Sequence, residues 1–138
     1  MEIDHIGFVV EDIQSGIDRF TTLYGFHVES ESVYDIAQHV KLAMLASSNG
    51  YRIELIQPVD ENSPSYDFMK KGGGLHHFCF CVDKMEDSIK QMKQNGHLLF
   101  KRPIEAILLG GRKVAFLYSK KTNQIVELVE SREMSNGR

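Results

Sequence analysis

The sequence predicts an α+β fold that consists of two tandem βαβββ modules. The first observation is an internal repeat, because moving the chain along itself by 72 positions aligns residues 41–47 with residues 113–119. The second is that each half contains one segment with apolar residues at helical spacing, followed by three short runs typical of strands. We therefore expect two copies of one structural unit in this chain.

The first module is expected to span about residues 2–58 and to open with a strand over residues 3–10. A helix follows, because apolar residues from Ile13 to Tyr24 recur at helical spacing. It should end before Gly25, because glycine readily adopts the left-handed conformation that terminates helices. Three short strands complete the module, over about residues 26–34, 40–46 and 52–57.

The second module is expected to span about residues 75–131 and to open with a strand over residues 76–82. Asp83 followed three residues later by Glu86 resembles a capping box, which predicts the start of the second helix. Gly96 has the position of Gly25 in the first module, at the end of that helix. Three further strands are expected, over about residues 98–104, 113–118 and 124–130.

A linker over about residues 59–74 separates the modules. Ser63-Pro64 favours the start of a short helix, and Gly72-Gly73-Gly74 favours a turn that lets the second module begin. The whole chain, residues 1–138, has the length of one domain that is stable without disulfides or a structural metal. A single domain made of two modules is therefore expected.

Composition narrows the choice of partner to a small molecule. The net charge of −3 disfavours nucleic-acid binding, which needs a concentrated basic surface. No apolar run approaches the ~18 residues of a membrane span, and the N-terminus shows no signal or transit peptide, so a cytoplasmic location is expected. Cys79 and Cys81 lie two positions apart on one predicted strand, where a bridge is unfavourable, so both should be reduced thiols.

Two kinds of polar residue are kept between the halves. His5 aligns with His77 at the offset of 72, and Glu54 aligns with Glu127 at an offset of 73. Any one of these residues alone would be interpreted as an ordinary strand residue. The repetition of both types changes that interpretation, because neither histidine nor glutamate is needed to hold a strand in a sheet.

Strand alternation predicts where these side chains point. Glu54 and Glu127 are flanked by aliphatic residues, so the carboxylates should lie on one face of the sheet and the aliphatic side chains on the other. Two half-sheets related by a pseudo-twofold axis would each present one His and one Glu to a shared concavity, as a curved mixed sheet around a metal-binding cleft. Imidazole nitrogens and carboxylate oxygens suit one divalent ion, Co, Ni, Zn, Mn or Fe, without selecting among them.

Several motifs carry a resemblance to a known family: Asp4-His5-Ile6-Gly7, Ile53-Glu54-Leu55-Ile56-Gln57-Pro58, Asn62-Ser63-Pro64, Gly74-Leu75-His76-His77-Phe78, Lys113-Val114-Ala115-Phe116-Leu117 and Val126-Glu127-Leu128. With these motifs the sequence resembles the vicinal oxygen chelate superfamily of glyoxalases, bleomycin resistance proteins and dioxygenases, over about residues 2–131. Within it, the sequence is most similar to the methylmalonyl-CoA epimerases.

The resemblance implies a metal-dependent isomerase that acts on an acyl-CoA, such as methylmalonyl-CoA, through a metal-stabilised enolate. It implies that His5, Glu54, His77 and Glu127 are the metal ligands, with Glu54 and Glu127 also as the candidate catalytic groups. It also implies a homodimer. His76 is not expected to be a ligand, because alternation places it on the face opposite to His77.

The sequence departs from the epimerase pattern at one position. The epimerase pattern usually has a glutamate shortly before the third strand, and this chain has Ala37 at about that position. Asp35 or His39 could supply the second acid–base group if the loop shifts. Glu54 could instead leave the metal and act as the base, in the manner of glyoxalase I.

Three alternatives to an epimerase follow from the same resemblance. A glyoxalase I-like lyase is one, and another enzyme of the superfamily acting in secondary metabolism is the second. The third belongs to a different class, a metal-free drug-binding resistance protein with the same fold. Such proteins generally lose the His/Glu set, whereas this chain keeps all four residues.

Overall fold

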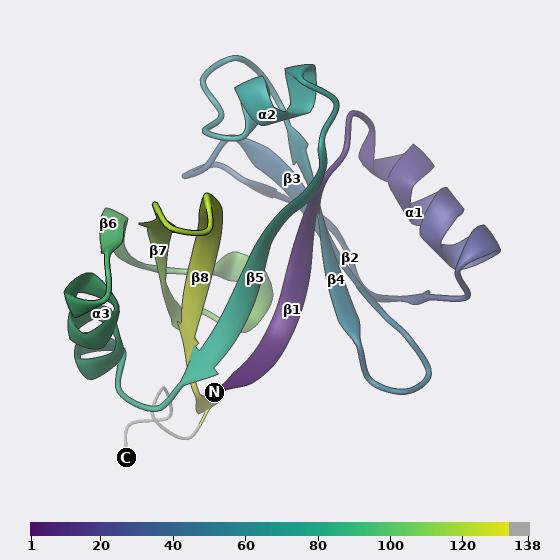
Figure 1. Cartoon of the computed structure of the whole chain (residues 1–138). Coiled ribbons are helices and arrows are strands. Elements are labelled where there is room, and N and C mark those ends of the chain that lie inside the picture. The colour runs from purple at the N-terminus through teal and green to yellow at the C-terminus, as the bar shows by residue number, and fades with distance from the viewer. Residues whose placement is uncertain (133–138) are drawn as a thin grey trace. The chain divides into compact units, whose positions relative to one another are not determined.

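The computed structural model describes residues 1–132, apart from the side chain of Arg102. These residues form eight strands, three α-helices and one short 3-10 helix, in the order shown by colour in Figure 1. They divide into two compact units. The N-terminal unit comprises His5–His76, and the C-terminal unit comprises Met1–Asp4 together with the described residues from His77 to Arg132.

The N-terminal unit has the predicted βαβββ plan. Its strand order is β2-β3-β4-β1, in which β1 pairs with β4 in parallel and the other neighbours are antiparallel. A short helix, α2, follows the strands, close to the predicted Ser63-Pro64 start. The elements are β1 (Glu2–Val9), α1 (Ile13–Leu23), β2 (His27–Asp35), β3 (Val40–Ala46), β4 (Arg52–Pro58) and α2 (Tyr66–Lys70).

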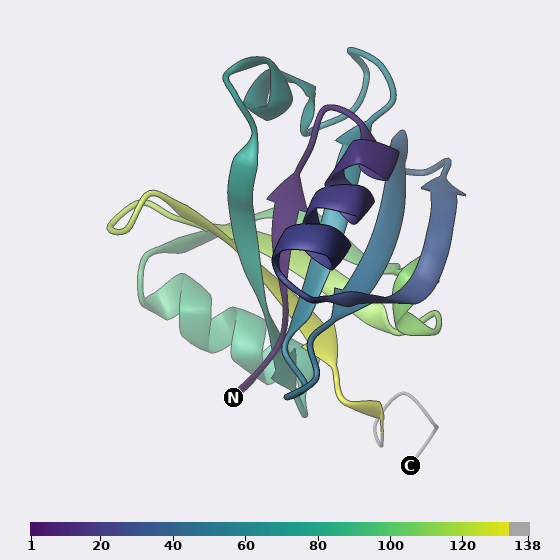
Figure 2. The same cartoon turned by 90° about the vertical axis from the view of Figure 1, so that its right-hand side faces the viewer.

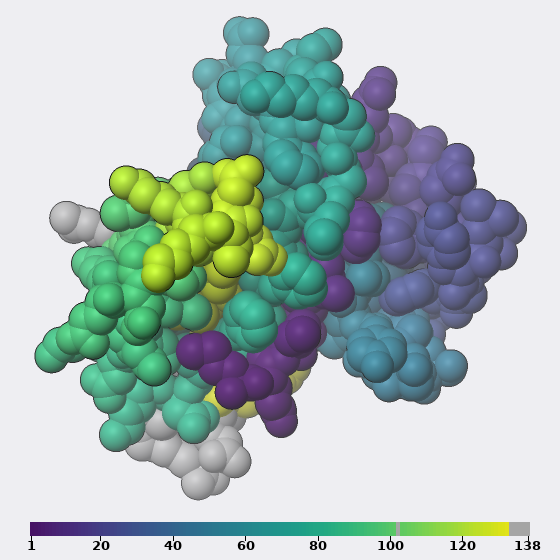
Figure 3. All heavy atoms as spheres, viewed as in Figure 1, coloured from purple at the N-terminus to yellow at the C-terminus, as the bar shows by residue number. Residues whose placement is uncertain are grey.

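Helix α1 covers one face of the N-terminal strands, as Figure 2 shows. The Asp12 carboxylate caps it by accepting a hydrogen bond of 2.9 Å from the Ser15 backbone N–H, which lowers the pKa of Asp12. Gly25 ends the helix with φ +73, as the sequence predicts. The buried side chains between helix and strands include Ile13, Ala43, Leu45, Ile53 and Leu55. The outer side of α1 forms part of the surface drawn in purple and blue in Figure 3.

The C-terminal unit repeats this plan. Its strand order is β5-β8-β7-β6, so each strand has the neighbours of its counterpart in the N-terminal unit. The repeated βαβββ architecture and the α+β class are thereby confirmed. The elements are β5 (Gly74–Val82), α3 (Met85–Gln94), β6 (His97–Glu105), the 3-10 helix η1 (Ile107–Leu109), β7 (Lys113–Ser119) and β8 (Gln124–Glu130).

The predicted capping box at the start of α3 is wrong. The residue that precedes the helix is Lys84, and its side chain makes no capping hydrogen bond. The helix starts at Met85, which is 5% exposed and packs with Ile89 in the core of this unit. The helix therefore begins at a buried core residue, and Glu86 lies in the first turn, where its charge suits the helix dipole.

Both cysteines are reduced, as predicted. Cys79 is buried, and burial raises the pKa of the partly exposed Cys81 thiol, which therefore stays protonated near neutral pH. Among the described residues, no helix is both long enough and apolar enough to span a membrane.

Gly73 is the glycine in the linker that the fold requires most strictly. Its φ is +66, and a Cβ atom there would lie 2.6 Å from the Val9 carbonyl oxygen. We expect Gly73→Ala to lower the free energy of unfolding by about 2 to 4 kcal/mol, the strain of a left-handed alanine plus a backbone clash. Gly25→Ala is the matched control, because Gly25 has φ +73 and open space around it. Chemical denaturation of both variants tests this; equal losses would show that the contact with Val9 costs nothing.

Candidate metal centre

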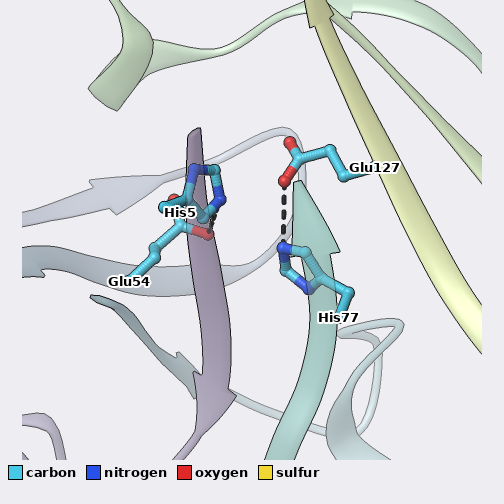
Figure 4. A group of neighbouring side chains, drawn as sticks. All are labelled: His5, Glu54, His77 and Glu127. Carbon is cyan, nitrogen blue, oxygen red and sulfur yellow. Dashed lines mark ion pairs between the residues drawn. The ribbon is translucent and has the colours of Figure 1, made fainter. Parts of the chain in front are cut away.

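The N-terminal unit holds the first His–Glu pair, drawn in Figure 4. His5 lies on β1 and Glu54 on β4, and the parallel register that sets Gly7 opposite Glu54 places both side chains on one face. The His5 Nε2 atom lies 3.6 Å from Glu54 Oε1. His5 is 1% exposed and Glu54 is 8% exposed, so both are withdrawn from solvent.

The C-terminal unit holds an equivalent pair, also drawn in Figure 4. His77 lies on β5 and Glu127 on β8, in the register that sets Cys79 opposite Glu127. The His77 Nε2 atom lies 2.9 Å from Glu127 Oε1, and both residues are buried. Each unit therefore brings together the histidine and the glutamate that the repeat singled out.

The strands place these carboxylates by simple alternation. On β4, Ile53 and Leu55 point into the core beneath α1, so Glu54 points to the other face. On β8, Val126 and Leu128 pack in the core that includes α3, so Glu127 also points to the other face. The site face is buried as well, and burial of a carboxylate is costly unless a positive partner compensates for it.

The donor chemistry fits a divalent metal ion. His5 and Glu54 in one unit, and His77 and Glu127 in the other, each offer one imidazole nitrogen and one carboxylate as candidate metal ligands. Neutral imidazole and carboxylate suit borderline to hard divalent ions, and a bound cation would compensate for the buried negative charge. The residues present therefore fit such an ion.

An aromatic contact beside His77 was not predicted from the sequence. The Phe116 ring on β7 meets the His77 ring edge to face, with centroids 5.7 Å apart and an interplanar angle of 83°. Phe116 is also the residue opposite Glu127 in the β7–β8 register. The 72-residue repeat could have drawn attention to Phe116, because it aligns Phe116 with Met44. Met44 lies opposite Glu54 in the β3–β4 register.

In the loop before β3, the Asp35 side chain accepts hydrogen bonds that hold the turn together. Its carboxylate accepts hydrogen bonds from the Ala37 backbone N–H at 3.0 Å and from the Gln38 side chain at 3.0 Å. It also accepts a longer one, 3.3 Å, from the Gln38 backbone N–H. Asp35 is 8% exposed and holds the turn that carries Ala37. His39 adopts φ +53, and its carbonyl accepts a hydrogen bond from Val59 N–H.

His76 and Arg112 both have structural contacts. The His76 ring packs edge to face against Phe68 of α2, with centroids 4.9 Å apart. The buried Arg112 guanidinium donates to the Leu109 carbonyl at 2.9 Å and to the Glu130 carbonyl at 3.1 Å. Its remaining nitrogen lies 3.6 Å from the Asp4 carboxylate, so Arg112 joins the first residues of β1 to the end of β8.

Comparison with known proteins identifies the relatives of the chain. Residues 4–116 match the model of the glyoxalase/bleomycin resistance protein/dioxygenase superfamily. The mitochondrial methylmalonyl-CoA epimerase of Dictyostelium discoideum is 30% identical over 133 residues, which are 94% of this chain and 78% of that protein. The ethylmalonyl-CoA/methylmalonyl-CoA epimerase of Cereibacter sphaeroides is 26% identical, over 91% of this chain and 95% of its own.

Solved structures agree with the sequence comparison. A variant of Streptomyces coelicolor methylmalonyl-CoA epimerase in complex with 2-nitronate-propionyl-CoA superimposes with a TM-score of 0.81 and 26% identity. The match covers 96% of this chain and 98% of the bacterial chain. The resemblance predicted from the motifs is thereby confirmed.

Proposed function

The chain belongs to the glyoxalase/bleomycin resistance protein/dioxygenase superfamily, and from this premise we propose that it is a metal-dependent epimerase of an acyl-CoA such as methylmalonyl-CoA. The observation that carries the proposal is the buried His–Glu pair in each of two repeated units. Relatives named as epimerases along most of the chain support an isomerase over a glyoxalase-like lyase. The retained His/Glu set argues against a metal-free drug-binding protein.

The proposal assigns one divalent metal ion to the whole chain. His5, Glu54, His77 and Glu127 would hold it, and the two modules would act as a single domain over residues 1–138. Three observations support this assignment: the two pairs have the same composition, they occupy equivalent strands, and all four side chains are buried. A homodimer, a cytoplasmic location and the identity of the metal remain predictions.

Epimerisation at C2 of a malonyl-type thioester requires loss and return of a weakly acidic proton. A divalent cation, when bound, supplies Lewis-acid stabilisation of the negative charge that develops on the thioester oxygen. The protein supplies the proton transfer, for which Glu54 and Glu127 are the candidate carboxylates. His5 and His77 would supply imidazole nitrogens as further donors to such an ion.

The second acid–base group is assigned to Glu54. Ala37 has no titratable side chain, and Asp35 is held by the turn around Ala37 and Gln38. Glu54 lies 3.6 Å from His5, whereas the His77–Glu127 pair is separated by 2.9 Å. The Glu54 carboxylate is therefore held less closely by its histidine than the Glu127 carboxylate is, which supports Glu54 as the group that would move the proton.

Hydrogen–deuterium exchange at C2 of methylmalonyl-CoA tests the proposed function. In heavy water, the cobalt-loaded protein is expected to replace the C2 proton with deuterium at least about 10³-fold faster than buffer with cobalt alone does. Proton NMR measures the loss of the C2 proton signal. Chelator treatment should abolish the exchange and added cobalt should restore it. Absence of exchange in protein that carries a full equivalent of cobalt would reject the epimerase while leaving the metal site intact.

A further inference from the structure

The repeat provides an internal comparison that separates shared features from those of one unit. The residue opposite the ligand glutamate on the neighbouring strand is Met44 in the N-terminal unit and Phe116 in the C-terminal unit. Met44 is completely buried, whereas Phe116 is half-buried. The two faces therefore differ directly beside the glutamates, although the strands around them correspond.

Phe116 is the centre of a small cluster in the C-terminal unit. On one side its ring meets His77. The Phe100 ring lies 6.1 Å from the Phe116 ring between centroids, and the Lys101 Nζ atom lies 5.9 Å above the Phe116 ring. Phe100 is 54% exposed and Lys101 is half-buried, so an aromatic ring faces solvent two contacts away from His77.

A β-bulge in β6 allows this arrangement. Leu99 pairs with Leu117 and Lys101 pairs with Phe116, so Phe100 is an extra residue in the ladder. A bulge redirects side chains that regular alternation would send to opposite faces. Consecutive residues, Phe100 and Lys101, can therefore both contact Phe116.

The N-terminal unit has a bulge at the equivalent point with a different use. Val28 pairs with Leu45 and Ser30 pairs with Met44, so Glu29 is the extra residue. The Glu29 carboxylate binds the Arg52 guanidinium, with oxygen–nitrogen distances of 2.8 and 3.1 Å. An ion pair within the unit thus occupies the place that Phe100 has in the C-terminal unit.

We propose that Phe100, Lys101 and Phe116 bind the pantetheine arm of the thioester substrate, an inference that rests on the proposed function. Such an arm alternates short apolar stretches with amide groups. The two phenylalanine rings suit the apolar stretch next to the sulfur. The Lys101 ammonium suits the carbonyl oxygen of the nearest amide, since lysine only donates hydrogen bonds. The surface is a specificity determinant, and Glu54 and Glu127 perform the proton transfer.

The test compares thioesters of methylmalonate that differ only in the arm, with exchange at C2 as the readout. Lys101→Met keeps the length of the side chain and removes its donors, and Phe100→Ala removes the exposed ring. Each variant is expected to raise KM for methylmalonyl-CoA about tenfold, with kcat within about twofold. With the S-ethyl thioester, which has no amide, Lys101→Met should equal the unmodified protein. With the N-acetylcysteamine thioester, which keeps the nearest amide, its tenfold effect should persist.

Controls separate this inference from general damage to the fold. Lys113→Met alters an exposed lysine on the opposite face of β7, and Leu23→Ala alters an exposed apolar residue at the end of α1. Both should leave KM unchanged for every thioester. Calorimetric titration of methylmalonyl-CoA into the chelator-treated variants gives a second readout, with affinity expected to fall about tenfold for Lys101→Met and for Phe100→Ala.

The outcomes distinguish the inference from the proposed function. If the unmodified protein exchanges the C2 proton and Lys101→Met has an unchanged KM for methylmalonyl-CoA, the assignment of the pantetheine-binding surface is wrong. The proposed epimerase function would not be affected by that result. If the Lys101→Met effect disappears with the N-acetylcysteamine thioester, Lys101 binds a more distant group and the assigned amide contact is overturned. If the unmodified protein neither exchanges C2 nor binds any of the thioesters, the proposed function itself fails.

Discussion

Substitution of His5 or His77 with alanine is expected to remove the same single equivalent of divalent metal. Each histidine belongs to a different unit, so loss of metal from both variants would show that one ion depends on both units. Loss of one ligand of a four-ligand set should weaken metal affinity by at least about 10²-fold, and C2 exchange should fall by at least about 10³-fold. Elemental analysis after gel filtration, on protein without a histidine tag, measures the metal directly.

His76→Ala is the matched control for this experiment. His76 adjoins His77 in the sequence but packs against Phe68, so its variant should keep the full equivalent of metal. Thermal unfolding of chelator-treated protein should show that His5→Ala and His77→Ala remain folded, because neither histidine belongs to the apolar core cluster of its unit. A full equivalent of metal in either ligand variant would refute the shared site.

The features that sequence could predict are those fixed by period and repetition. Alternation on β4 and β8 correctly sent Glu54 and Glu127 away from the aliphatic cores, because a residue shifted by one position would exchange the two faces. Gly25 and Gly96 correctly marked helix ends, since both adopt positive φ. These features depend on local rules that act identically in both modules.

The features that sequence could not predict depend on tertiary contacts. Helix α3 begins at the buried Met85 and has Lys84 at its N-cap position, whereas the sequence pattern predicted Asp83 there. The contact of Phe116 with His77 depends on which residue of β7 faces Glu127, and Phe100 joins it only through a bulge. Neither the strand register nor a bulge has a reliable signal in one sequence.

The loop before β3 shows how the structure narrows a choice that the sequence left open. From sequence, Asp35, His39 and Glu54 were alternatives for the second acid–base group. In the structure, three hydrogen bonds to the Asp35 carboxylate fix its position in the turn. A base must be able to reach its proton, which favours Glu54 as the proposed base, because its carboxylate lies on the site face.

Glu54→Gln is therefore expected to separate metal binding from proton transfer. The amide oxygen of glutamine can still donate to a metal ion, although it is uncharged, so the variant should retain a full equivalent of metal. It cannot accept the C2 proton at neutral pH, so the exchange rate should fall about 10²- to 10⁴-fold. Glu54→Ala is the comparison, because it removes both functions and should lose metal as well. If Glu54→Gln exchanges the C2 proton within threefold of the unmodified rate, Glu54 is not the base. Asp35 and His39, which lie two positions to either side of Ala37, would then be the remaining alternatives.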